Sequence, residues 1–389
     1  MSISRRELSF YLWLFFTSLL VGCYNITPPE SPLSPVSTAT LLSTPSAKAS
    51  HVVPKLTATP SPVASITPSI SPSPSTTATP HPLYRYTIPG LRAREYPGGQ
   101  IQIRWALAQT AAFSQYYIDY PSDGLTITGV MYVPAGEGPF PTLILLHGYI
   151  DRERYFSGAD TWQAAEFFAA QGYLVIAPDL RSWGEADVGL SLFHTGLTAD
   201  AINLIASLHT LPEVAPKRIG LWGHSMGGGI ATKVLVVAGH QVDAAVLYAP
   251  NSADDSDLIS RWGRGCLPGE SGGAEVQCNP AEVIPDNTSP ELVEAYITQA
   301  QNPDFLRQVA PLYYLDSITT PLQIHIGTAD GEFLPETPPE WSNKLTEALR
   351  TAGKEVDYYL YPEQGHAFVG ESWARFLERS LIFFDDHLK

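Results

Sequence analysis

The stretch 219–229 constrains the fold of this chain more than any other, and it reads Ile-Gly-Leu-Trp-Gly-His-Ser-Met-Gly-Gly-Gly. It begins as a short apolar run, typical of a buried strand, and it runs directly into a helical pattern. Between the two, Ser225 is flanked by Gly223 and Gly227, as a turn too tight for side chains at those positions requires. Such a turn, called the elbow below, holds a serine hydroxyl at the carboxyl edge of a sheet, beside the positive end of a helix.

The residues around the elbow alternate between strand and helix patterns. Apolar or β-rich runs predict strands at 116–120, 127–133, 142–146, 173–177, 244–249, 322–326 and 356–361. Helical periodicity predicts helices at 160–171, 198–211, 226–239, 341–352 and 373–387. Asp160 is the expected cap of the first of these helices, and Asp123-Gly124 predicts a hairpin. The alternation indicates an α/β fold with a mostly parallel sheet, covered by helices on both faces, and an antiparallel start at one edge.

The alternation is interrupted between 251 and 318, which is too long for a simple connection and too short for a domain. A helix capped by Ser289-Pro290 is expected within it. Because the segment leaves from the carboxyl edge of the sheet, above the elbow, we expect a lid-like insertion. A surface extension far from the serine is the alternative.

Two of the three cysteines, Cys266 and Cys278, lie in this insertion. The third, Cys23, lies near the amino terminus, so these two form a pair with no further cysteine left over. In an exported protein such a pair suggests a disulfide. Zinc is the alternative, although two cysteines without paired histidines nearby make a poor tetrahedral site.

The amino terminus has the pattern of a secretory signal. Arg5 and Arg6 precede an apolar run, 8–21, that is short for a membrane span. The run ends in Leu-Val-Gly-Cys, which resembles the bacterial lipobox. The resemblance implies a signal peptide at 1–22 and a lipid anchor on Cys23, so that the protein is exported to the bacterial cell envelope and held at a membrane. An ordinary signal peptide or an uncleaved anchor is the alternative.

A spacer rich in Pro, Ser and Thr follows at 23–82 and lacks the apolar content needed for a folded core. The folded domain is therefore expected at 83–389. The whole chain has a formal net charge of −16, although 1–82 is slightly basic. The domain at 83–389 is therefore strongly acidic. This charge argues against nucleic acid as a partner and against electrostatic docking on anionic lipid.

Residues from about 115 to the end resemble an α/β-hydrolase, and they are most similar to the catalytic domain of the prolyl oligopeptidase family. The resemblance rests on the elbow and on Leu145-Leu146-His147-Gly148-Tyr149, Pro178-Asp179-Leu180-Arg181-Ser182-Trp183-Gly184, 310–318, 321–330 and 361–368. Taken together, these motifs follow the Ser–Asp–His order of the fold.

The resemblance implies a catalytic triad. Ser225 is a weak nucleophile on its own, and His366 is the expected base because it lies on the loop after the last core strand. Asp330, after the preceding strand, would hold the imidazole in the productive tautomer. Glu332 and Asp357 are alternatives for the acid, although Asp357 lies in an alternating strand and is expected to face solvent.

An oxyanion hole requires two preorganised donors, for which the backbone N–H groups of Met226 and Tyr149 are expected. The other histidines of the motifs, His224 and His147, are interpreted as structural. The implied mechanism is acyl transfer through a serine ester, and we expect neither a metal nor an organic cofactor.

The expected function is the hydrolysis of small-molecule carboxylic esters. Oligopeptidases of the resembled family carry a large propeller that 83–114 is too short to form, so cleavage of peptides ranks second. The alternative from another class is a surface lipoprotein that binds a ligand through an inactive hydrolase fold. Retention of Ser225, His366 and both elbow glycines argues against it.

Overall fold

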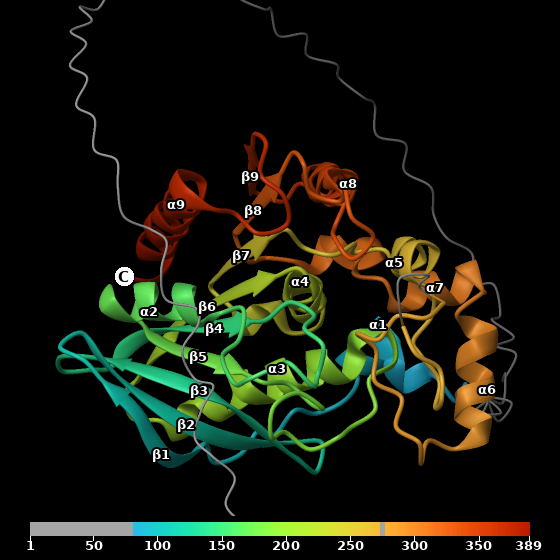
Figure 1. Cartoon of the computed structure of the whole chain (residues 1–389), viewed down its shortest axis with the longest axis horizontal. Coiled ribbons are helices and arrows are strands. Elements are labelled where there is room, and N and C mark those ends of the chain that lie inside the picture. Colours follow the sequence, from blue (N-terminus) through green and yellow to red (C-terminus); the bar gives the residue numbers. More distant parts are fainter. Residues whose placement is uncertain (1–80, 273–276) are drawn as a thin grey trace, which may run out of the picture. The chain divides into compact units, whose positions relative to one another are not determined.

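In the computed structural model, which describes residues 81–272 and 277–389, nine strands form one sheet in the order β1-β2-β3-β5-β4-β6-β7-β8-β9 (Figure 1). Neighbours from β5 to β9 pair in parallel, and β1, β2, β3 and β5 pair antiparallel. The strands are β1 (Gln102–Gln109), β2 (Phe113–Ser122), β3 (Leu125–Pro134), β4 (Phe140–Leu146), β5 (Leu174–Pro178), β6 (Val214–His224), β7 (Ala244–Tyr248), β8 (Leu322–Gly327) and β9 (Val356–Tyr361).

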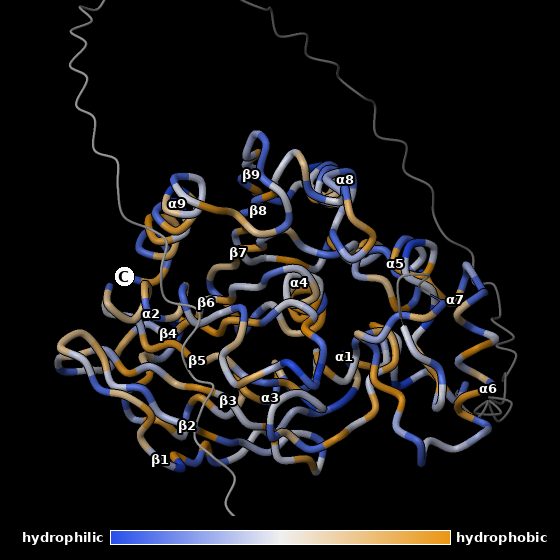
Figure 2. The backbone as a smooth tube through the Cα atoms, in the orientation of Figure 1, coloured by the Kyte–Doolittle hydropathy of each residue, from blue (hydrophilic) through white to orange (hydrophobic). Residues whose placement is uncertain are grey.

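Helices cover both faces of this sheet, and further helices lie in the segment between β7 and β8. The helices are α1 (Ile88–Arg92), α2 (Trp162–Ala170), α3 (Thr195–Ser207), α4 (Met226–Ala238), α5 (Asp255–Trp262), α6 (Pro290–Gln299), α7 (Pro303–Val309), α8 (Pro339–Thr351) and α9 (Gly370–Leu388). Apolar residues of α3, α4 and α8 pack on one face, and those of α2 and α9 pack on the other. Figure 2 shows the apolar character of the central strands between these layers.

The predicted α/β fold is confirmed, because the parallel strands β4, β5, β7 and β8 and the second half of β6 are buried and the strands alternate with helices. The antiparallel start is also as expected, and Asp123 and Gly124 take up the positive φ angles of a hairpin turn between β2 and β3. Strand β1 is absent from the sequence prediction. All eight of its residues are exposed.

The expected signal peptide, the lipid anchor on Cys23 and nearly all of the spacer fall outside the described residues. Within 81–272 and 277–389, no helix has both the length and the apolar character needed to cross a membrane.

The segment between β7 and β8 contains α5, α6 and α7, and its disulfide between Cys266 and Cys278 confirms the predicted pairing. The side chain of Ser289 caps α6 by accepting the N–H of Leu292, as the sequence predicts. Arg261, at the end of α5, donates to the carbonyl oxygens of Gly331 (3.1 Å) and Phe333 (2.8 Å). These contacts tie the insertion to the loop that follows β8.

Glu282 joins the insertion to the residues before α3 through a buried carboxylate. Its Oε2 accepts the N–H of Phe193 at 3.0 Å and the hydroxyl of Tyr296 at 2.7 Å. Burial raises the pKa of Glu282 from 4.5 to about 7, although these two donors oppose the shift.

This raised pKa predicts a pH-dependent stability. The unfolded chain releases the Glu282 proton between about pH 4.5 and 7 while the folded chain keeps it, so the free energy of unfolding should fall across that window. The shift corresponds to about 3 kcal/mol. Urea unfolding at several pH values should show that Glu282→Gln removes this decrease, whereas Glu294→Gln, on the exposed face of α6, keeps it. Equal slopes for wild type and Glu282→Gln would contradict the assignment.

Candidate active site

Ser225 lies at the turn between β6 and α4, with φ 54° and ψ −117°. Its N–H donates to the carbonyl oxygen of Tyr248 on the neighbouring strand at 2.9 Å. A Cβ atom at Gly223 would lie 2.3 Å from the carbonyl oxygen of Gly227, and one at Gly227 would lie 2.1 Å from that of Leu146. Side chains at either position would therefore displace the backbone, so the two glycines make this turn sterically feasible.

His366, on the loop between β9 and α9, lies between Ser225 and Asp330. Its Nε2 is 2.8 Å from the Ser225 Oγ, and its Nδ1 is 3.0 and 3.1 Å from the two carboxylate oxygens of Asp330. An ionised carboxylate only accepts hydrogen bonds, so Nδ1–H donates to Asp330 and Nε2 accepts the serine hydroxyl. The structure thus brings together three residues that are 36 to 141 positions apart in the chain.

Asp330 is 4% exposed, and its orientation is set by Thr337. The Thr337 N–H donates to Oδ1 at 3.1 Å, and its hydroxyl lies 2.9 Å from Oδ2. Sequence reasoning missed this threonine, which lies in a proline-rich loop without any local signal. The two alternative acids lie elsewhere: Glu332 is exposed, and Asp357 is exposed on β9, where it accepts from the side chain of Gln323.

Tyr149 and Met226 line the same pocket as Ser225. Within the described part of the chain, the N–H groups of both residues are free of hydrogen bonds. The N–H of Gly148 is engaged, because it donates to Oδ2 of Asp160 at 2.6 Å. Tyr149, the residue after Gly148, therefore has an N–H that is available to a ligand at Ser225.

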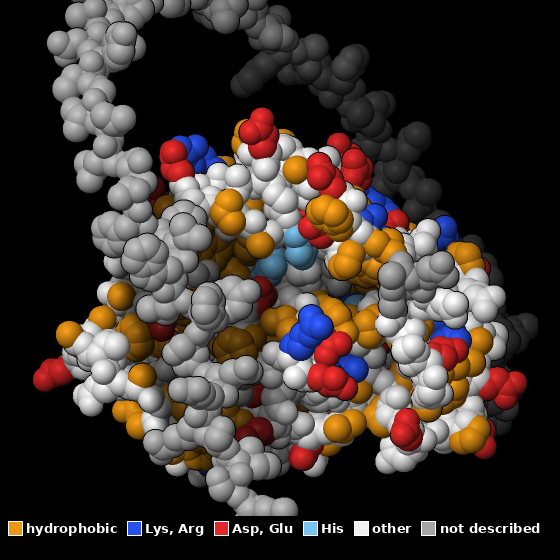
Figure 3. Space-filling model, viewed as in Figure 1, with side chains coloured by type: hydrophobic (Ala, Val, Ile, Leu, Met, Phe, Trp, Pro, Cys, Tyr) orange, Lys and Arg blue, Asp and Glu red, His pale blue; other side chains and the backbone are white. Residues whose placement is uncertain are grey.

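The pocket has a volume of about 240 Å³, and residues of the insertion form much of its wall. Its lining is chiefly apolar and comprises Tyr149, Ser225, Met226, Asn251, Trp262, Gly272, Asn279, Pro280, Ala281 and Pro335. Figure 3 shows histidine side chains in a depression, with hydrophobic as well as charged side chains around it. The insertion thus reaches the serine instead of extending away from it.

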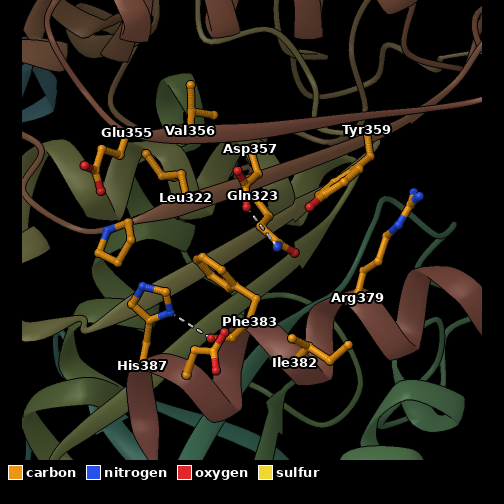
Figure 4. Close-up of a pocket in the computed structure, with 12 residues that line it drawn as sticks. Leu322, Gln323, Glu355, Val356, Asp357, Tyr359, Arg379, Ile382, Phe383 and His387 are labelled. Atoms are coloured by element: carbon orange, nitrogen blue, oxygen red, sulfur yellow. Dashed lines mark hydrogen bonds between the residues drawn. The ribbon is translucent and has the colours of Figure 1, made fainter. Parts of the chain in front are cut away.

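A second pocket, of about 380 Å³, lies at the opposite ends of β8 and β9, where the strands begin (Figure 4). Leu322, Val356 and Tyr359 line it together with Asp357 and Arg379. It is therefore remote from Asp330 and His366, which follow the carboxyl ends of the same strands. Among the residues that the structure describes, no group of histidines, cysteines and carboxylates is arranged to hold a metal ion.

Two further side chains contact the site in a way that the sequence analysis did not predict. Asp160 was expected to cap α2, and this prediction is wrong: the residue before the helix is Thr161, and neither side chain caps it. The carboxylate of Asp160 instead binds Gly148 and the ring of His224. His224 is buried, as expected of a structural residue, but it is also part of this polar contact.

The Alpha/beta hydrolase family model matches residues 143–379. Over 150 residues the chain is 28% identical to the lysophosphatidylserine lipase ABHD12 of Danio rerio, which covers 33% of this chain and 37% of that protein. Over 149 residues it is 25% identical to the esterase FrsA of an Enterobacter species, which covers 37% of this chain and 33% of that protein. The chain thus spans about a third of the length of these two relatives.

Solved structures show the same fold at low identity. Acetyl xylan esterase 1 from a Thermoanaerobacterium species has a TM-score of 0.54 and 17% identity, over 78% of this chain and 92% of that one. The acylaminoacyl peptidase of Pyrococcus horikoshii has a TM-score of 0.52 and 18% identity, over 72% of this chain and 42% of that one. With the family model matching more than half of its residues, the chain belongs to the alpha/beta hydrolase family.

Proposed function

We propose that this protein is a serine hydrolase that cleaves carboxylic esters of small molecules. The observation that carries the proposal is the continuous path of short contacts from Ser225 through His366 to Asp330, with its serine end open to an apolar pocket. In this arrangement the serine has a base within hydrogen-bond reach, and the base is itself oriented by a buried acid.

The proposed reaction begins when Ser225 Oγ attacks the carbonyl carbon of the ester and His366 Nε2 takes the serine proton. Asp330 stabilises the imidazolium that forms, and the N–H groups of Tyr149 and Met226 bind the developing oxyanion. Collapse of this intermediate breaks the bond to the alcohol, which receives the proton from His366. Water then attacks the acyl-enzyme by the same route and releases the acid.

The lining of the pocket supports an ester over a peptide with a free amino terminus. Its described residues include neither Asp nor Glu, so a substrate ammonium group would be buried there without a partner, which is costly. A lipase and esterases are among the proteins that the chain resembles. Cleavage of peptides is the second candidate, favoured by the motifs that the sequence shares with the prolyl oligopeptidase family.

A series of p-nitrophenyl esters of increasing acyl length, run beside aminoacyl nitroanilides, tests the assignment. We expect short acyl esters to have the highest kcat/KM, because the pocket is small. Nitroanilides that are cleaved faster than every ester would favour the peptidase.

We further propose that the enzyme works outside the cytoplasm, anchored through a lipid on Cys23. The lipobox-like motif supports this, as does the disulfide, because such bonds persist in oxidising compartments. Mass spectrometry of the protein from bacterial membranes should find a diacylated amino-terminal cysteine, and Cys23→Ser should release the enzyme from the membrane fraction. An unmodified Cys23 in the mature protein would contradict the anchor.

A further inference from the structure

A second histidine–carboxylate pair lies beside the proposed triad. Both of its residues precede Ser225 in the sequence, whereas Asp330 follows it. The pair is formed by His224, the residue that precedes the serine, and Asp160, in the turn before α2. The Nδ1 of His224 lies 2.9 and 3.0 Å from the two oxygens of Asp160. The side chains of His224 and Asp160 are 8% and 20% exposed. The proposed acyl transfer assigns this pair no role.

The hydrogen bonds of His224 indicate that its ring is doubly protonated. Its Nδ1 faces the Asp160 carboxylate, and its Nε2 lies 3.1 Å from the carbonyl oxygen of His366. Both partners are acceptors, so each ring nitrogen has to carry a hydrogen for both contacts to form. Charge-assisted hydrogen bonds of this kind are stronger than those between neutral groups.

The electrostatics of the pair agree with this geometry. Burial lowers the pKa of His224, but the Asp160 carboxylate outweighs burial, so the pKa is raised above its ordinary value. Burial likewise opposes ionisation of Asp160, yet His224 and the Gly148 N–H lower the pKa of this carboxyl to about 2. Each member of the pair therefore favours the charged form of the other.

The surroundings of His224 include other titratable groups. The Tyr248 ring stacks on the imidazole with centroids 4.3 Å apart, and the His366 ring lies 4.8 Å away. Asp330 adds a more distant negative charge that also favours the protonated His224. His147 also lowers the pKa of Asp160 and so favours the ionised carboxylate.

The pair connects the two loops that flank the serine. Asp160 accepts the N–H of Gly148 at 2.6 Å, which places the next peptide, that of Tyr149, beside Ser225. His224 donates to the main chain of His366, whose side chain reaches the serine. Both loops are thus fastened to the elbow at the residue adjacent to the nucleophile.

We propose that Asp160 and His224 are positioning residues that act as a charged pair, holding the His366 loop and the 148–149 loop against Ser225 only while His224 keeps its proton. This inference rests on the proposed function. Loss of the proton removes one of the two donors, and neutral His224 then releases either Asp160 or the His366 carbonyl. The hydrolysis rate should therefore fall at alkaline pH as His224 deprotonates.

The pH profile of ester hydrolysis tests the role of the charge. We expect Asp160→Asn to lower kcat about 10- to 100-fold with KM within about twofold, because misplacement of reacting groups affects the chemical step more than binding. Without the carboxylate, the alkaline decrease in kcat should begin at least about one pH unit lower. Asp160→Glu, which keeps the charge, should retain the wild-type position of this decrease. Asp316→Asn, at an exposed site, is the matched control and should resemble wild type.

His224→Gln provides a second variant, since glutamine keeps one donor and does not titrate. Its kcat should be low, and the alkaline decrease should be absent. His209→Gln, on the exposed end of the segment after α3, controls for the loss of a histidine. It should keep the wild-type kcat and the wild-type alkaline decrease. An alkaline decrease that is unchanged in Asp160→Asn and persists in His224→Gln would overturn the proposal.

The charge of His224 is also measurable without any turnover, which separates this inference from the proposed function. The NMR spectrum of Ser225→Ala protein labelled with ¹⁵N-histidine is compared with that of the Ser225→Ala/His224→Gln double variant. The signals that are lost in the double variant belong to His224. We expect imidazolium chemical shifts for both ring nitrogens at pH 7, with loss of the proton only at higher pH. A neutral ring at pH 7 would refute the charged pair even if Ser225 proves to be the nucleophile.

Discussion

Replacement of Ser225 by alanine should lower kcat for ester hydrolysis by about 10⁴- to 10⁶-fold, the range found when the nucleophile of serine proteases is removed. The reason is that the Oγ atom, 2.8 Å from the base, forms the covalent bond to the acyl group, and alanine offers no replacement. KM should change little, because most of the pocket wall is formed by other residues.

Two observations make the Ser225→Ala experiment specific. The variant should fold normally, because a hydroxyl at the elbow is exchanged for a hydrogen and the glycines that permit the turn are kept. Ser260→Ala, at an exposed position on α5, should retain wild-type kcat. Turnover by Ser225→Ala within tenfold of wild type would mean that the hydrolysis does not pass through this serine.

Asp330→Asn has the second largest expected effect, a decrease in kcat of about 10⁴-fold, as seen for the equivalent change in serine proteases. Asparagine nearly preserves the shape of the side chain but removes its charge. Thr337 donates its N–H to Oδ1, so the amide oxygen should remain on that side and the amide NH₂ should occupy the position of Oδ2, facing His366 Nδ1. The NH₂ group favours the tautomer that carries its proton on Nε2, where it cannot accept the serine proton.

Steady-state kinetics on the best p-nitrophenyl ester measure this effect. Glu332→Gln and Asp357→Asn are the matched controls, since both acids were alternatives and both are exposed. We expect these two variants to keep kcat within about twofold of wild type, as most surface substitutions do. A large loss in Glu332→Gln together with an active Asp330→Asn would show that the acid had been assigned to the wrong residue.

Local chemistry and strand order made most of the fold and the central part of the site predictable. The elbow signals its own conformation, because Gly223 and Gly227 are needed wherever the turn forms. In parallel sheets the residues after each strand meet at one edge, so the positions after β8 and β9 brought Asp330 and His366 into consideration. The cysteine pair was predictable because the insertion holds two cysteines with none left over.

The errors arose where contacts distant in the chain override a local pattern. Asp160 precedes an apolar helix, which is where a capping aspartate is expected, but its carboxylate is used by Gly148 and His224. Thr337 contacts Asp330 only because the loop after β8 folds back on itself. Strand β1 alternates apolar and polar residues, yet Ile103, Trp105 and Leu107 remain about half exposed, so its pairing with β2 is not driven by burial in the core.

Labelling with a fluorophosphonate tests the central claim most directly, because the reagent reacts with a serine hydroxyl only where a base activates it. Intact-mass and peptide analysis of the wild-type protein should show one phosphonyl group per chain, located on the peptide that contains Ser225, with loss of ester hydrolysis in parallel. Ser225→Ala should remain unlabelled. Persistence of full esterase activity after complete labelling, or a label on another residue with Ser225 unmodified, would contradict the account.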